Sequence, residues 1–141
     1  MGAFRFRRWP TVSELLLFIA EDFSEDDVAA FRATVTRMRT TLKWGGAKPV
    51  FVDETDAEEE LRTVGAALSL PGRTMGTSER DAFHSAERLI EAARGGSAEC
   101  QLDFELELDG VFVGDIEAGT LSRTLREGLL DPWRSRIAGL G

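Results

Sequence analysis

The sequence predicts an α+β fold in which amphipathic helices pack against a mostly antiparallel sheet of about four strands. Two patterns carry this prediction. Residues 101–110, QLDFELELDG, alternate apolar and acidic side chains with the period of a β-strand, whereas residues 24–42 and 78–94 repeat apolar side chains with the period of a helix. The length of 141 residues, with 43% hydrophobic and 30% charged residues, suits a single domain over residues 1–141.

The first two elements are predicted before residue 23. FRFRR (residues 4–8) alternates phenylalanine and arginine, which predicts a strand with one apolar and one basic face, ended by Pro10. A helix is predicted over residues 12–22, because Thr11 and Glu14 have the spacing of a capping box. The apolar residues at helical spacing are Val12, Leu15, Leu16, Ile19 and Phe23. A buried strand through LLLFIA is the competing interpretation.

The next helix has clear boundaries. Ser24 is its expected N-cap, and the acidic residues 25–27 complement the positive end of the helix dipole. Gly45 and Gly46 are expected to end it. Its apolar stripe is Val28, Phe31, Val35, Met38 and Leu42.

The middle of the chain predicts a short buried strand over residues 49–53, then a helix, a loop over 71–78 and a second helix. The first of these helices, over 57–68, is predicted from the spacing of Ala57, Leu61, Val64 and Leu68. The second runs from Ser78 to Arg94 and is ended by Gly95 and Gly96. Its buried face is Ala82, Phe83, Ala86, Leu89, Ile90 and Ala93.

A β-hairpin is predicted around LDGVF. A two-residue Asp109–Gly110 turn would put Phe112 and Ile116 on the acidic face. A three-residue loop over 108–110 keeps the apolar face consistent, with Leu106 opposite Phe112, and is preferred. Asp103 then lies opposite Asp115. A final helix is predicted to begin at Asp131 and Pro132, and its inward residues are Trp133, Ile137 and Leu140. The predicted order is strand, helix, helix, strand, helix, helix, strand, strand, helix.

Two acidic elements are the candidate binding residues. They lie in DETDAEEE (residues 53–60) and on the predicted hairpin. The predicted partner-binding residues are Asp53, Glu54, Asp56, Glu58, Glu59, Asp103, Glu105, Glu107, Asp115 and Glu117. Like charges opposite each other need compensation, which Arg5 and Arg7 would supply if the first strand lay beside residues 100–107.

The sequence predicts no catalytic residue, no metal site and no cofactor. Carboxylates two apart on a strand are separated by about 6.6 Å, which does not favour convergence on one cation. His84, the one histidine, is expected on the solvent face of its helix. Cys100, the one cysteine, is expected in the core because it shares the parity of Leu102 and Phe104.

The net charge of −8 argues against a nucleic-acid partner and favours a basic protein partner. No apolar run is long enough for a membrane span, so the expected location is the cytoplasm. The predicted function is a non-enzymatic acidic protein-binding domain, in its most specific form an immunity or inhibitor protein that neutralises a basic toxin or nuclease. One alternative is a small enzyme or ligand-binding domain centred on Asp103, Glu105, Asp115 and Glu117. Another is a homo-oligomeric structural protein that buries a face with Val111 and Val113.

Overall fold

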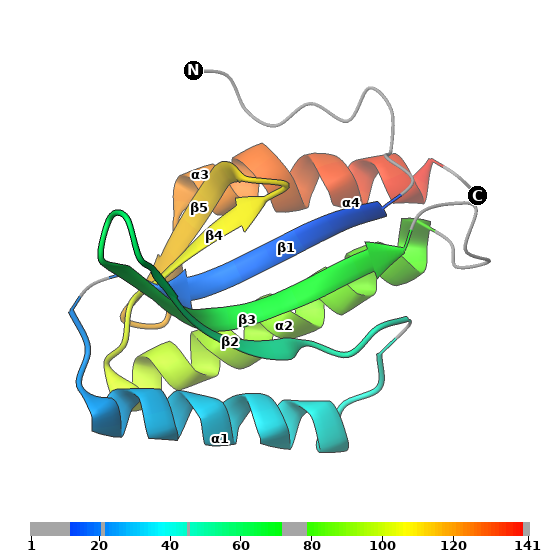
Figure 1. Cartoon of the computed structure of the whole chain (residues 1–141). Coiled ribbons are helices and arrows are strands. Elements are labelled where there is room, and N and C mark those ends of the chain that lie inside the picture. Colours follow the sequence, from blue (N-terminus) through cyan, green and yellow to red (C-terminus); the bar gives the residue numbers. More distant parts are fainter. Residues whose placement is uncertain (1–11, 21, 45, 72–78, 140–141) are drawn as a thin grey trace.

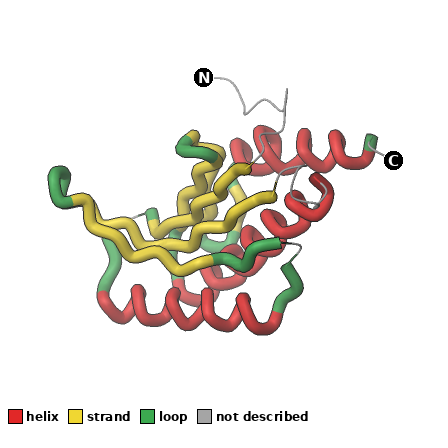
Figure 2. The backbone as a smooth tube through the Cα atoms, turned by 45° about the vertical axis from the view of Figure 1, so that its right-hand side comes forward, coloured by secondary structure: helices red, strands yellow, loops and turns green. Residues whose placement is uncertain are grey.

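The computed structural model describes residues 12–20, 22–44, 46–71 and 79–139. Within these residues an antiparallel sheet carries the helices on one face, which confirms the α+β class (Figures 1 and 2). The strands are β1 (Val12–Ile19), β2 (Val50–Asp56), β3 (Leu61–Pro71), β4 (Phe104–Leu108), β5 (Val111–Glu117) and β6 (Thr120–Leu121). The sheet has six strands instead of the predicted number of about four, because β1 and β3 were predicted as helices. The helical segments are α1 (Glu25–Thr41), α2 (Glu79–Cys100), α3 (Arg123–Leu125), the π-helical turn η2 (Arg126–Leu130) and α4 (Asp131–Ala138). The strand predicted over residues 4–8 lies outside the described residues.

The strand order is β2-β3-β1-β4-β5-β6, and every neighbouring pair is antiparallel. From β1 to β4 the chain therefore follows the β-α-β-β-α-β arrangement of ferredoxin-like domains. β5, β6 and the C-terminal helical segment extend it. Because the helices all lie on one side, the opposite face of the sheet has no helix over it in the described part of the chain (Figure 2).

The helix predicted over residues 12–22 is wrong, and the competing strand interpretation is right. Leu15, Leu17 and Ile19 face the helices and are almost fully buried, whereas Leu16 and Phe18 lie half-buried on the other face. A central strand that is apolar on both faces shows no alternation, so its residues fitted a helical spacing equally well.

The helix predicted over residues 57–68 is also wrong. Residues 57–60 form a turn between β2 and β3, in which Glu60 has a positive φ of 54°. The side chains of β3 that face the helices are Val64, Ala66, Leu68 and Leu70. The strand β2 is longer than predicted, and it lies at the edge of the sheet instead of being buried.

The prediction for α1 is confirmed at its start and along its buried side. The Ser24 side chain accepts a hydrogen bond from the backbone N–H of Asp27, and the Asp27 carboxylate accepts one from Ser24 N–H, which completes a capping box. The buried residues are Val28, Phe31, Val35 and Met38. Leu42 is the C-cap residue and is 39% exposed, so it does not belong to the buried stripe.

The helix α2 has the predicted buried face but continues past Gly95 and Gly96 to Cys100. Buried Ser97 holds this extension, because its Oγ accepts a hydrogen bond from the backbone N–H of Gly119 at 3.1 Å. Cys100 consequently ends a helix and is exposed, so its predicted burial is wrong.

The hairpin β4–β5 combines features of both registers considered. Asp109 and Gly110 form a two-residue turn with positive φ values of 51° and 82°, and Glu107 pairs with Phe112. A β-bulge then adds Val113 as an extra residue, so that Phe104 pairs with Ile116, which keeps Ile116 on the apolar face as the preferred register predicted. The predicted three-residue loop is wrong, and Glu105 replaces Asp103 as the residue opposite Asp115.

The C-terminal helical segment begins earlier than predicted. Ser122 is its N-cap, with its Oγ accepting a hydrogen bond from Leu125 N–H, and Asp131 lies inside the helical run. The π-helical turn η2 ends at Leu130, two residues before Pro132, a residue whose ring and missing N–H disfavour a regular helix interior. Trp133 and Ile137 are buried as predicted, whereas Leu140 lies outside the described residues.

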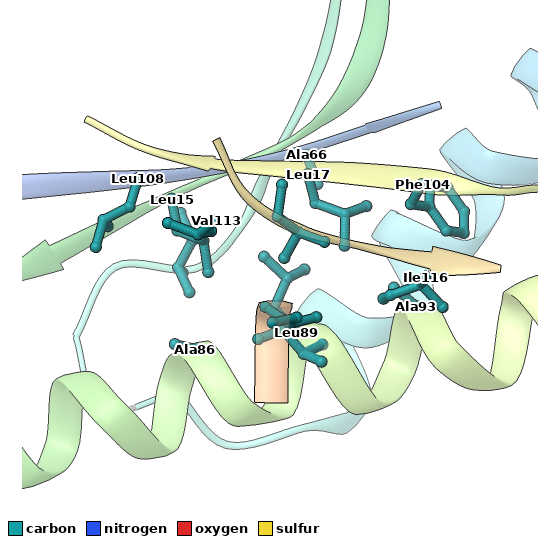
Figure 3. Packing of buried hydrophobic residues seen from close by; sticks show 14 of the residues in the cluster. Leu15, Leu17, Ala66, Ala86, Leu89, Ala93, Phe104, Leu108, Val113 and Ile116 are labelled. Carbon is teal, nitrogen blue, oxygen red and sulfur yellow. The ribbon is translucent and has the colours of Figure 1, made fainter. Parts of the chain in front are cut away.

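The core lies between the covered face of the sheet and α2. Figure 3 shows side chains of β1, β4 and β5 directed toward Ala86, Leu89 and Ala93 of α2. At one end of α2 the ring of Phe83 meets that of Trp133 edge-on, with centroids 5.2 Å apart. This packing leaves the other face of the sheet to present the candidate site.

Candidate functional site

The uncovered face of the sheet carries two rows of side chains that cross five strands. The strand registers give one row as Val50, Ala67, Leu16, Glu107 and Phe112. They give the next row as Val52, Gly65, Phe18, Glu105 and Asp115. We call these two rows, with the neighbouring Glu117, the open sheet face. It is apolar on β2, β3 and β1 and becomes acidic on β4 and β5.

The apolar part of the open sheet face is accessible. Val50 is 54% exposed and Phe112 is 50% exposed, at opposite ends of one row. Leu16 lies between them and is half-buried, as is Phe18 in the next row. Contiguous exposed apolar side chains bordered by polar ones are typical of surfaces that another molecule covers.

The acidic part has no local compensation. Glu105 lies directly opposite Asp115, which is unfavourable for two like charges. Among the ion pairs of the described residues, none includes Glu105, Glu107, Asp115 or Glu117.

Compensation by Arg5 and Arg7 would require the first predicted strand to lie beside residues 100–107. β4 lies between β1 and β5, so both of its edges are already paired. Arg5 and Arg7 themselves lie outside the described residues.

Asp53 belongs to the other face of the sheet. Its carboxylate accepts two hydrogen bonds from Arg62, Nε to Oδ1 at 2.9 Å and Nη2 to Oδ2 at 2.8 Å. Nη1 of Arg62 also donates to Glu25 of α1 at 2.9 Å. The hydrogen bonds from Arg62 lower the pKa of Asp53, and the two carboxylates raise the pKa of Arg62. Through Arg62, Asp53 therefore connects the sheet edge to α1.

The remaining acids of the first element surround the β2–β3 turn. Oδ1 of Asp56 accepts hydrogen bonds from the backbone N–H groups of Glu58 and Glu59, at 2.9 and 3.3 Å, so Asp56 shapes the turn. Glu54, Glu58 and Glu59 are exposed. β3 and β1 separate β2 from β4 by about 14 Å, so the two acidic elements do not form one cluster.

Asp103 precedes β4 and accepts a hydrogen bond from Ala118 N–H at 3.2 Å. It therefore holds the β5–β6 turn. Next to it a hollow of about 230 Å³ is lined by Asp115, Glu117, Thr120, Leu121 and Ser122. Two of the four carboxylates proposed for carboxylate chemistry thus border a common hollow.

No group of three or more histidine, cysteine or acidic side chains within the described ranges is arranged to hold a metal ion. His84 is exposed, with Nδ1 3.8 Å from Oε1 of Glu87, as its helical position predicts. Cys100 is exposed at the end of α2.

Sequence reasoning missed the apolar residues of the open sheet face. The run LLLF (residues 15–18) could have indicated a strand with apolar side chains on both faces, because Leu16 and Phe18 are as apolar as the core residues on either side of them. Val113 cannot contribute to the predicted oligomer face, because the bulge turns its side chain inward and leaves it only 4% exposed. Phe112 is the exposed apolar residue that the sequence analysis had assigned to the core.

Comparison with known proteins gives no family for this chain. No family model, no curated protein and no solved structure matches it. None of the helices in the described part of the chain has both the length and the apolar character needed to cross a membrane. The open sheet face is therefore the candidate binding surface of this chain.

Proposed function

We propose that this chain is a non-enzymatic binding domain whose open sheet face docks a basic protein. One observation supports the proposal: partly exposed apolar side chains adjoin four carboxylates that have no ion-pair partner among the described residues. In its most specific form the domain is a cytoplasmic immunity or inhibitor protein that masks the cationic site of a toxin or nuclease.

Binding would proceed in two physical stages. The net charge of −8 attracts a basic partner and raises the rate of encounter. Contact then removes water from Phe18 and Phe112, while Glu105 and Glu107 accept charge-assisted hydrogen bonds from arginine or lysine side chains. The partner surface that fits therefore has basic residues beside exposed apolar side chains.

Two other functions have weaker support. The hollow beside Asp115 and Glu117 favours the binding of a small ligand, but both carboxylates are at least partly exposed and Asp103 is engaged with the backbone. A homo-oligomer would have to use Val50 and Phe112 in place of the buried Val113.

The test is a pull-down from the native cell extract at low and at high salt, with the full chain as bait. The first variant is Glu105→Lys/Glu107→Lys, in which the lysine at position 105 would oppose Asp115, so that folding is favoured. The control is Asp22→Lys/Glu99→Lys, which makes the same change of net charge at two exposed positions away from the open sheet face.

The wild type and the control are expected to hold the same basic protein at low salt and less of it at high salt. The Glu105→Lys/Glu107→Lys variant is expected to lose it. An empty pull-down, or equal losses in the two variants, would refute docking through this face.

A further inference from the structure

The two edges of the sheet differ. β6, at one edge, has only two residues, Thr120 and Leu121. β2, at the other, pairs along Val50–Asp56 with β3 and with no other strand of the described residues, without a register shift. Natural sheets usually shorten, twist or cover their edges, because an unpaired edge can take up another strand. The regular edge of β2 therefore offers backbone donors and acceptors to an added strand.

An open groove runs beside this edge. It measures about 660 Å³ and lies between α1 and the β2–β3 hairpin. Its α1 side is lined by small residues, Ala29, Ala33 and Thr36, with Val28 buried at the base. Side chains of a strand added to β2 alternate between the two faces of the sheet, so every second one would enter this groove.

The groove carries excess positive charge in an otherwise acidic chain. Arg62 is neutralised by Asp53 and Glu25. Arg32 lies over the ring of Phe51, with its guanidinium carbon 4.8 Å from the ring centroid. Neither Arg32 nor Arg37, which also lines the groove, belongs to an ion pair among the described residues. An acidic side chain in the groove would complete the charge balance.

We propose that the β2 edge binds an extended peptide segment of a partner as a seventh strand, with an acidic side chain directed to Arg32. This mode of recognition obtains affinity from main-chain hydrogen bonds and specificity from alternate side chains. On the other side of the added strand, Glu54 and Asp56 favour basic residues. They also disfavour a second copy of this chain, because paired β2 strands would bring like charges together.

The probe is a phage-displayed library of random linear peptides, selected on the full chain. The enriched sequences are expected to alternate, with an acidic residue among the apolar ones on one side. A synthetic peptide of that sequence is then titrated against four chains: the wild type, Arg32→Glu, Ala33→Trp to fill the groove, and Arg126→Glu. The last is the control, because Arg126 is exposed and lies outside the groove.

Arg32→Glu and Ala33→Trp are each expected to weaken peptide binding about tenfold or more, and Arg126→Glu to leave it unchanged. Amide exchange read by NMR is expected to slow at every second residue of β2 when the peptide binds, because only alternate N–H groups face the added strand. Glu105→Lys/Glu107→Lys is expected to have no effect on the peptide, which separates this proposal from docking on the open sheet face.

Three results would overturn the proposal. The first is a selection that enriches no peptide. The second is a peptide whose affinity is unchanged by Arg32→Glu and Ala33→Trp, or is lowered by Arg126→Glu as much as by those two substitutions. The third is a stable dimer in light scattering with slowed exchange along β2 in the absence of peptide, because a second copy would then occupy the edge.

Discussion

Gly65 lies in the centre of the open sheet face, opposite Phe18 on one side and Val52 on the other. A Cβ at this position would lie 2.1 Å from the carbonyl oxygen of Leu17 and 2.8 Å from Cα of Phe18, and both are backbone atoms. The close approach of β1 and β3 thus depends on the absence of a side chain.

Gly65→Ala is expected to lower the free energy of unfolding by at least about 2 kcal/mol, because the backbone of β1 has to move. Gly96→Ala is the control: no atom lies within 4 Å of the added Cβ, and alanine favours a helix, so we expect a gain of about 1 kcal/mol. Urea denaturation of both variants measures the difference. Equal effects would mean that β1 and β3 do not approach as closely as described.

The second prediction at the scale of residues concerns Asp53 and the pH dependence of folding stability. Because Arg62 holds the pKa of Asp53 below its ordinary value of 3.8, the folded chain favours the charged carboxylate more than the unfolded chain does. This stabilisation is complete above the ordinary pKa and is lost as the pH falls through the lower, folded value. The stability difference between wild type and Asp53→Asn should therefore be largest at neutral pH and shrink below about pH 4.

Chemical denaturation across that range measures the effect, with Asp22→Asn as the control at an exposed carboxylate that has no ion pair among the described residues. A difference that is independent of pH would contradict the assignment of the Asp53–Arg62 contact as a charged pair.

At the scale of elements, the bulge in β5 decides which residues the hairpin exposes. It leaves Phe112 on the open sheet face and returns Ile116 to the core. Gly114 follows the extra residue with a φ of 147°, and a Cβ there would lie 2.4 Å from Cβ of Leu125 and 2.7 Å from its Cα. The bulge is therefore fitted against the start of the C-terminal helical segment.

Gly114→Ala is expected to cost more than about 2 kcal/mol, since it combines a disfavoured φ with a contact to the α3 backbone. Gly110→Ala, in the turn of the same hairpin, has a positive φ but no atom within 4 Å, so only about 1 kcal/mol should be lost. Thermal unfolding of both variants tests this order. A smaller loss for Gly114→Ala would contradict the packing of β5 against α3.

The elements that the sequence predicted well are those defined by neighbours along the chain. α1 has its cap at Ser24 and its apolar stripe within one continuous segment. β1 and β3 were mistaken for helices, and each pairs with a strand far away in sequence: β1 with β3 and β4, and β3 with β1. In β3, Ala66, Ala67 and Gly65 have little strand propensity, and pairing with β1 and β2 overrides it. α2 passes through Gly95 because Ser97 and Gly119 hold its end, a contact between distant segments.

At the scale of the whole molecule, strand order determines the candidate site. The sequence predicted the carboxylates of β4 and β5, because their alternation is local. It could not predict that Leu16 and Phe18 lie beside Glu107 and Glu105, since this requires β1 to pair with β4. Nor could the sequence predict that the side chain of Asp53 faces α1 whereas that of Glu54 does not. An acidic composition thus becomes a defined surface only once the sheet is assembled.

The measurement that tests the central claim most directly is hydroxyl-radical footprinting of the full chain, alone and with the basic protein that it captures. If the partner docks on the open sheet face, Phe18 and Phe112 lose reactivity in the complex. Leu42, which is 39% exposed at the end of α1, keeps its reactivity. Protection of Leu42 with unchanged reactivity of Phe18 and Phe112 would contradict the account and place the binding surface among the helices.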